Sequence, residues 1–152
     1  MKELVVMSNT VFTVFWIMIV AIYGLIPSIS HSFYELPEKA RGLFTFTLWS
    51  FAIPMMIVGE HGLMFFAGAS ICFVGAAADY RNELTDTVHY VCAVLSIALG
   101  ILYWGFKFDN WYVGIPIVIS AAVLYPILRK RATLWVEIVA YYCITLPFYY
   151  YL

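Results

Sequence analysis

Long blocks of apolar residues follow one another along this chain, and short groups of polar or charged residues separate them. An α-helix that crosses the hydrocarbon core of a bilayer, about 30 Å thick, needs about 20 mostly apolar residues, and local thinning tolerates shorter ones. Six blocks meet this requirement and predict six membrane-spanning helices. Their predicted bounds are residues 10–29, 43–58, 63–78, 88–106, 111–128 and 134–151, with Asn82 as an alternative start of the fourth.

The segments that connect these blocks are short. Residues 59–62, 107–110 and 129–133 join their neighbours directly, and the connections 31–42 and 79–87 are only slightly longer. Short connections place consecutive helices side by side in opposite directions. The pattern therefore predicts an all-α, integral membrane six-helix bundle, in which residues 1–152 form a single transmembrane domain with short loops.

The composition agrees with a chain whose solvent is lipid. Of the 152 residues, 64% are hydrophobic and 11% are charged, whereas soluble domains have about 45–50% apolar and about 25% charged residues. A water-soluble globule is therefore excluded, because too few polar side chains remain to cover its surface. A formal net charge of −1 gives no basic surplus for nucleic acid. The predicted partner is the lipid bilayer, and no nucleic acid is expected.

Lysine and arginine are distributed unevenly between the two ends of the predicted bundle. The end that holds both termini carries Lys2 and Lys107, whereas the opposite end carries six basic residues. These six are Lys39, Arg41, Arg81, Arg129, Lys130 and Arg131. Because cytoplasmic loops carry the excess of lysine and arginine, we expect both termini on the outer side.

Ionisable side chains gather at the predicted inner end, and Glu137 is the clearest of them. It lies about one turn inside the last apolar block, where an ionised, unpaired carboxylate costs about 2–3 kcal/mol. We expect a partner for it, with Arg131 or a neighbouring histidine as the candidates. The alternative is a shallow glutamate that reaches the interface or pairs for structural reasons only.

Glu83, Asp86 and His89 follow one another at intervals of three residues, so they share one face of a helix. Asn82 can cap that helix, and acidic residues in its first turn suit its dipole without any catalytic role. His89 lies one turn deeper. An aspartate one turn before a histidine can fix the tautomer of the imidazole for metal binding or proton transfer. His89, Asp86 and Glu137 are therefore the candidate catalytic residues.

His31 stands in a polar run, residues 28–35, at the inner end of the first block. The hydroxyl groups of this run can satisfy carbonyls that Pro27 leaves free. Alternatively His31, His89, an aspartate and Glu137 meet in one inner pocket. Two histidines with carboxylates form an acceptable set of ligands for a divalent metal.

The third block carries Gly68, Cys72 and Ala76 at intervals of four residues, with Gly75 beside them. Such a stripe of small side chains lets two helices approach closely. It is consistent with a helix packed at the centre of the monomer. It is also consistent with a face through which a homo-oligomer forms.

Several short stretches resemble a known family. They are Ser30-His31-Ser32-Phe33-Tyr34, Arg41-Gly42-Leu43-Phe44, Gly75 through Asp79, and His89-Tyr90-Val91-Cys92-Ala93. Within residues 30–98 the chain resembles small bacterial members of the CREST-type membrane proteins, the group of alkaline ceramidases, progestin/adiponectin-type receptors and further six-span bacterial proteins. The resemblance implies a six-span fold in the bacterial inner (cell) membrane and a metal-dependent intramembrane hydrolase that acts on lipid amides or esters.

The same resemblance suggests site residues and a cofactor. Ser30 or His31, Asp79 and His89 match the family's pattern of a serine, an aspartate and histidines, so that His31, His89 and Asp79 are the implied ligands of a zinc ion. The chain departs from the pattern after His89, where it has no further histidine and no HxxxH motif. Two expected zinc ligands are therefore missing, and Glu137 is the only late candidate in their place.

Three functions are consistent with these observations. The first is a non-enzymatic membrane protein, such as a sensor, a scaffold or a subunit of a complex, with a polar pocket near the inner leaflet. The second is the intramembrane hydrolase, in which a metal-bound water held by His31, His89 and carboxylates attacks a lipid substrate. The third is an oligomeric channel or a proton-coupled transporter that uses Glu137 and His89.

Overall fold

The computed structural model describes residues 2–59 and 62–151, so the predicted connection 59–62 lies partly outside the described residues. Within the described ranges the chain forms α-helices and short 3-10 helices and no β-strand, which confirms the predicted all-α class. The α-helices are α1 (Lys2–Tyr23), α2 (Ser32–Glu35), α3 (Gly42–Val58), α4 (Leu63–Ala76), α5 (Glu83–Phe108), α6 (Gly114–Leu128), α7 (Ala132–Thr145) and α8 (Phe148–Tyr151). The 3-10 helices are η1 (Glu38–Ala40), η2 (Trp111–Val113) and η3 (Arg129–Arg131).

Several of these helices are suited to a membrane. Five helical segments are long and apolar enough to cross a bilayer, namely Lys2–Tyr23, Glu38–Val58, Glu83–Phe108, Trp111–Leu128 and Ala132–Tyr151. Helix α4 is also apolar but has only 14 residues. The protein therefore has several helices that could span a membrane. The count of six spans and the orientation of the termini stay predictions.

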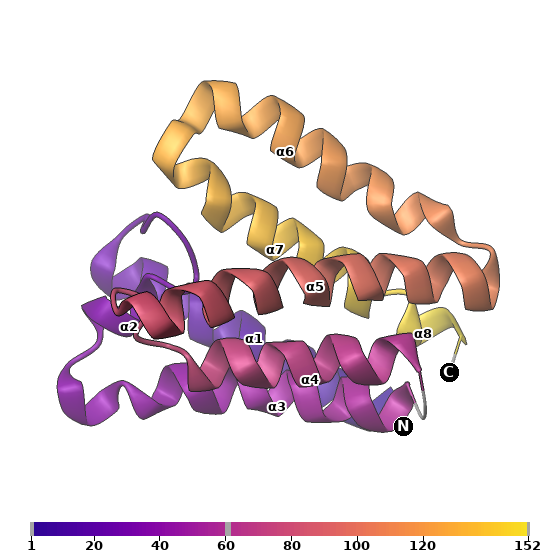
Figure 1. The fold of residues 1–152 in the computed structure, drawn as a ribbon, viewed down its shortest axis with the longest axis horizontal. Helices are drawn as coiled ribbons and strands as arrows, with labels where there is room; N and C mark the ends of the chain where they lie inside the picture. Colours follow the sequence, from indigo (N-terminus) through magenta and orange to yellow (C-terminus); the bar gives the residue numbers. More distant parts are fainter. Residues whose placement is uncertain (1, 60–61, 152) are drawn as a thin grey trace.

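Consecutive long helices run in opposite directions (Figure 1). As a result, the start of α1 and the end of α8 lie at the same end of the molecule, which we call the terminal end. The opposite end, which we call the loop end, holds the connections 24–41, 77–82 and 129–131. This is the up-and-down order that the short connections predict.

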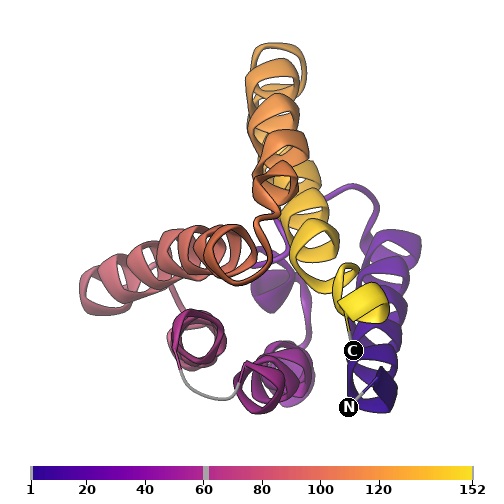
Figure 2. The same ribbon diagram turned by 90° about the vertical axis from the view of Figure 1, so that its right-hand side faces the viewer.

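Helices α5 and α7 meet near the terminal end and diverge toward the loop end (Figures 1 and 2). At their contact Gly100 lies against Ile144, and a Cβ on Gly100 would be only 2.8 Å from the Ile144 Cδ1. One turn further along α5, Trp104 is fully buried, and its indole N–H donates to the Ile144 carbonyl oxygen at 2.9 Å. The close contact of α5 and α7 is thus confined to one end of the molecule.

Helix α6 is the outermost helix, and Figure 2 shows it beyond α7 and away from α1, α3 and α4. Among its residues Gly114 and Ile117 are buried, whereas large apolar side chains such as those of Val118, Val123 and Ile127 are exposed. A helix that is apolar around its whole circumference is typical of a membrane span. Its exposed side chains therefore suit contact with lipid rather than with water.

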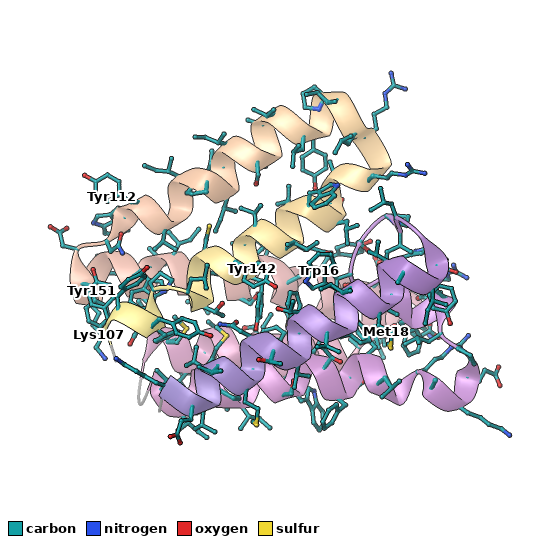
Figure 3. The ribbon with its side chains drawn as sticks, turned by 180° about the vertical axis from the view of Figure 1, so that it is seen from behind. Trp16, Met18, Lys107, Tyr112, Tyr142 and Tyr151 are labelled. Carbon is teal, nitrogen blue, oxygen red and sulfur yellow. The ribbon has the colours of Figure 1, made fainter. Side chains whose placement is uncertain are left out.

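Aromatic and hydroxyl side chains join α1 to α7. Phe12 stacks on Tyr141 with ring centroids 3.6 Å apart. The hydroxyl of Thr13 and the indole nitrogen of Trp16 lie 2.6 Å and 3.3 Å from the Tyr142 hydroxyl oxygen, and Figure 3 shows Trp16 and Tyr142 side by side. These contacts pack α1, the first long helix, against α7, the last one.

The first predicted helix differs most from the structure. Residues 10–29 were expected to be helical, but α1 begins at Lys2 and ends at Tyr23. Gly24 follows with a φ of 75°, and its N–H donates to the Val20 carbonyl oxygen at 2.9 Å. A glycine in the left-handed region just past the last turn is a common helix terminator, because it has no Cβ to clash.

The last predicted helix, residues 134–151, is divided in the structure into α7 and α8. Pro147 lies between them, and proline interrupts a helix because it has no backbone N–H to donate. The other helices agree with their predicted ranges to within a few residues, and α5 begins at Glu83, directly after the alternative start at Asn82.

Candidate functional site

The connection between α1 and α3 is the centre of the candidate site. Its residues 24–36, which we call the connecting segment, turn back into the protein at the loop end. Ile26, Ile29 and Leu36 are buried, and Ser32 is fully buried. The hydroxyl of Ser32 donates to the Ile29 carbonyl oxygen at 2.6 Å. An irregular segment with buried backbone needs partners for its polar groups, and the helices around it supply them.

Helix α7 binds the connecting segment through two hydrogen bonds. The N–H of Leu134 donates to the Pro27 carbonyl oxygen at 3.0 Å, which satisfies one of the N–H groups that the first turn of a helix leaves without an intrahelical partner. The N–H of Ile29 donates to the Glu137 Oε2 at 2.5 Å. The side-chain partner expected for Glu137, Arg131 or a histidine, is therefore replaced by a backbone N–H. Arg131 is exposed at the surface, whereas Glu137 faces the connecting segment.

Helix α5 binds the same segment through His89. The imidazole is 2% exposed, its Nδ1 lies 3.0 Å from the Ala77 carbonyl oxygen, and its Nε2 lies 2.9 Å from the Ser30 Oγ. A carbonyl oxygen only accepts, so in the neutral imidazole Nδ1 carries the proton and Nε2 accepts the hydroxyl proton of Ser30. His89 and Glu137 thus contact consecutive residues of the connecting segment, Ser30 and Ile29. The single inner pocket that would also include His31 and an aspartate stays a prediction.

Asp86, which was predicted to fix the tautomer of His89, is not the residue that contacts the His89 Nδ1. The Ala77 carbonyl, at the end of α4, fixes the imidazole of His89, whereas Asp86 stays partly exposed in the first turn of α5. The side chain of Asn82 caps this helix and accepts from the Leu84 N–H at 3.2 Å, which confirms the predicted cap. The acidic residues beside it need no further role, because they lie at the positive end of the helix dipole.

His31 and Asp79 lie in a second polar group, nearer the surface. The Nδ1 of His31 is 3.2 Å from the Tyr80 hydroxyl oxygen, and its Nε2 is 3.4 Å from the Glu35 Oε1. The hydroxyl of Tyr34 donates to the Asp79 Oδ1 at 2.9 Å. These contacts tie the connecting segment to the loop between α4 and α5.

Tyr34 is the most connected side chain of this group. Its oxygen also accepts from the Arg81 N–H at 2.9 Å, and the Arg81 guanidinium lies 3.9 Å from the centroid of the Tyr34 ring. Burial and the hydrogen bond donated to Asp79 raise the pKa of Tyr34 to about 12. Burial also raises the pKa of Tyr80 above its usual value of 10.

The three metal ligands that the family resemblance implies, His31, His89 and Asp79, do not converge on one point. Across the described part of the chain, no group of three or more His, Cys, Asp or Glu side chains is placed to share a metal ion. His31, His89 and Asp79 each bind a different protein partner, and both ring nitrogens of His89 are within hydrogen-bond distance of such partners. A zinc site needs ligands that converge on one point, so these residues do not fit zinc.

A cavity of about 100 Å³ lies in the middle of the bundle, beside Ser30 and Glu137. Side chains of α1, α3, α4, α5 and α7 and the connecting segment line it. They are Phe12, Ile29, Ser30, Leu48, Phe51, Met55, Ile71, Val74, Ala93, Ser96, Ile97, Glu137, Ala140, Tyr141, Ile144 and Thr145. The hydroxyls of Ser96 and Thr145 donate to carbonyls of their own helices. The cavity is therefore mostly apolar away from Ser30 and Glu137.

The stripe of small residues packs inside the chain. A Cβ on Gly68 would lie 2.6 Å from the Ala52 carbonyl oxygen, and one on Gly75 would lie 3.0 Å from the Trp49 Nε1. Gly68 and Gly75 thus allow α4 to approach α3 closely. Packing within one chain accounts for both glycines, and a homo-oligomer formed through Gly68, Cys72 and Ala76 stays a prediction.

The fold and site define an all-α protein with several potential membrane-spanning helices and a polar group buried at the end of an apolar cavity. Comparison of the chain with protein-family models, with curated proteins and with solved structures finds no match. The resemblance to the CREST-type proteins therefore stays an expectation. What the site does must be inferred from its geometry.

Sequence reasoning missed the partners of the site rather than its ionisable members. Ala77 and Ile29 act through backbone groups, which every residue has, so no sequence signal marks them. Tyr34 and Tyr80 are two of 12 tyrosines, and only their position in the two polar connections distinguishes them from the rest.

Proposed function

We propose that the protein is a membrane protein that binds a small amphipathic molecule in its central cavity, as a sensor, scaffold or subunit of a complex would. The observation that carries this proposal is the cavity of about 100 Å³, whose apolar wall includes the Glu137 carboxyl group of α7 and the Ser30 hydroxyl of the connecting segment. Ligand sites are typically apolar hollows with a few placed polar groups.

The size of the cavity limits the ligand. An apolar cavity of about 150 Å³ stays free of water and binds benzene, so this one has room for only a short run of carbon atoms. A molecule with a longer chain would place its remaining carbons in the surrounding lipid. The apolar surface of the helices suits such a ligand, because lipids are concentrated around a protein of this composition.

Cavity-filling variants test the proposal. Ala93→Leu and Ile97→Phe add volume to the wall of the cavity, whereas Ala122→Leu adds it to the exposed surface of α6. The protein would be purified in mild detergent, and bound molecules below the mass of a phospholipid would be identified by native mass spectrometry. We expect such a ligand on the wild type and the α6 control but not on the filled variants, with circular dichroism showing that all four fold. Equal occupancy of all four proteins, or none on the wild type, would overturn the proposal.

A second candidate function, acyl transfer, is favoured by one observation. Ser30 and His89 form a hydroxyl–imidazole pair at 2.9 Å, the Ala77 carbonyl orients the imidazole, and Ser30 lines the cavity. This is the arrangement of a nucleophile and its base. The Ser30 Oγ would bond to the carbonyl carbon of an ester while its proton passes to the His89 Nε2. The departing alcohol would take that proton, and water would then hydrolyse the acyl-serine.

Covalent labelling tests this second candidate. An alkyl fluorophosphonate reacts with an activated serine and releases fluoride, and the adduct is located by peptide mass spectrometry. We expect an adduct on Ser30 that Ser30→Ala abolishes and that His89→Gln strongly reduces, while Ser28→Ala keeps it. No adduct on the folded wild type, or one that survives Ser30→Ala, would exclude this reaction.

A further inference from the structure

The acidic side chain of Glu137 indicates which kind of molecule the cavity takes. Glu137 lines the cavity and is partly accessible. Its Oε2 accepts the Ile29 N–H. Within the described part of the chain, its other oxygen has no hydrogen-bond partner, while a carboxyl group offers about four acceptor positions. The site thus has acceptor capacity that the protein itself does not use.

The wall of the cavity contains no cation to balance this group. Its lining residues include no lysine, arginine or histidine. The two nitrogens of His89 already face Ala77 and Ser30, and those of His31, within the connecting segment, face Tyr80 and Glu35. The Arg81 guanidinium stacks on Tyr34 in the outer polar group. A molecule bound in the cavity can therefore supply both a donor and a positive charge to Glu137.

We infer that the ligand of this cavity is a cationic amphiphile, a primary amine on an unbranched alkyl chain. The inference rests on the proposed binding function and specifies it. The ammonium group supplies several N–H donors and a positive charge to Glu137, and the first carbons of the chain lie along apolar residues such as Ile29 and Ile97. A fatty acid would instead place a second carboxylate beside Glu137, and like charges repel strongly where water is scarce.

The acceptor oxygens of Glu137 and Ser30 also indicate where the ammonium group of the ligand would lie, which is the loop end of the cavity. Ser30 gives its hydroxyl proton to His89, so its oxygen keeps acceptor capacity toward a ligand. Glu137 and Ser30 therefore both present acceptors near one point of the wall. The hydroxyls of Ser96 and Thr145, deeper in the bundle, are used within their own helices.

A comparison of three ligands of equal chain length tests the inference. Dodecylamine, dodecanol and dodecanoic acid would be titrated into the protein in phosphatidylcholine nanodiscs, and binding would be measured by native mass spectrometry, with empty nanodiscs as the blank for partitioning. We expect dodecylamine to bind at least about tenfold more tightly than dodecanoic acid, with dodecanol between them. Glu137→Gln should reduce the affinity for the amine to that for the alcohol, whereas Glu38→Gln, at an exposed position, should leave it unchanged.

The outcomes separate this inference from the function on which it rests. Equal affinity for all three ligands, tighter binding of the acid, or an amine preference that survives Glu137→Gln would overturn the inference alone. Binding by none of them would overturn the cavity-binding function and the inference together. The matched Glu38→Gln variant shows whether any loss follows only from a change of net charge.

Discussion

The indole N–H of Trp104 donates to the carbonyl oxygen of Ile144 at 2.9 Å, and this bond joins α5 to α7 where the two helices meet. Ile144 lies in the last turn of α7, whose carbonyls lack intrahelical partners, and Trp104 is fully buried. The bond and the packing of the indole therefore hold the terminal end of the molecule together.

Trp104→Phe should lower the free energy of unfolding by about 1–3 kcal/mol, because it removes the donor to a buried carbonyl and leaves a void. The measurement is denaturation in detergent micelles. Trp49→Phe is the control, since Trp49 also donates to a carbonyl, that of Cys72 at 3.1 Å, but is 42% exposed. If the two variants lose the same free energy of unfolding, the buried contact of Trp104 with α7 stabilises the protein no more than the exposed contact of Trp49 does.

Glu137 stabilises the connecting segment through its acceptor oxygen. Glu137→Leu leaves the Ile29 N–H without a partner, and a buried unsatisfied donor costs about 1–3 kcal/mol. Glu137→Gln keeps one acceptor oxygen and should lose less stability. Hydrogen exchange should therefore become faster at Ile29 in the leucine variant than in the glutamine variant, and equal exchange in both would argue against this bond.

Gly68 sets the distance between α3 and α4. In Gly68→Ala the new Cβ would lie 2.6 Å from the Ala52 carbonyl oxygen and 2.7 Å from the Met56 Cγ, so the helices must separate, at a cost of about 1–3 kcal/mol. A Cβ on Gly42, at the start of α3, meets nothing within 4 Å, and Gly42→Ala should stabilise the protein by about 0.5–1 kcal/mol. Thermal unfolding of both variants checks the contrast. Chemical crosslinking of the wild type and of Gly68→Leu separately tests the predicted oligomer.

Tyr34 should make the protein sensitive to alkali. Its pKa is raised from 10 to about 12 by burial and by its hydrogen bond to Asp79, so the folded state holds this proton more tightly than the unfolded state. The stabilisation is complete below about pH 10 and is lost as the pH rises through about 12. Unfolding curves at pH 9 to 12 should show this fall for the wild type and a smaller one for Tyr34→Phe, while a fall of equal size in the variant would assign it to other groups.

The class of fold was predictable from the sequence because it depends on long apolar blocks and short connections. The end of α1 was not predictable from hydropathy. Gly24 stands inside an apolar run, and residues such as Ile26 and Ile29, which are buried in an irregular segment, are as apolar as residues that face lipid. A pattern of apolar residues alone does not distinguish the two surroundings in a membrane protein.

The ionisable members of the site were predictable for a similar reason. His89 and Glu137 stand out because such side chains are rare and costly within apolar blocks. Their partners did not stand out, because the Ile29 N–H and the Ala77 carbonyl belong to the backbone. The cavity depends on side chains from five helices, and no spacing along one helix reveals it.

Because the start of α1 and the end of α8 share one end of the molecule, fluorescent or enzymatic tags fused there would test whether the two termini share a compartment. A tag inserted near Arg129, between α6 and α7, would sit at the far end. Pairing such fusions gives each measurement of sidedness its own internal standard, whichever way the protein is inserted.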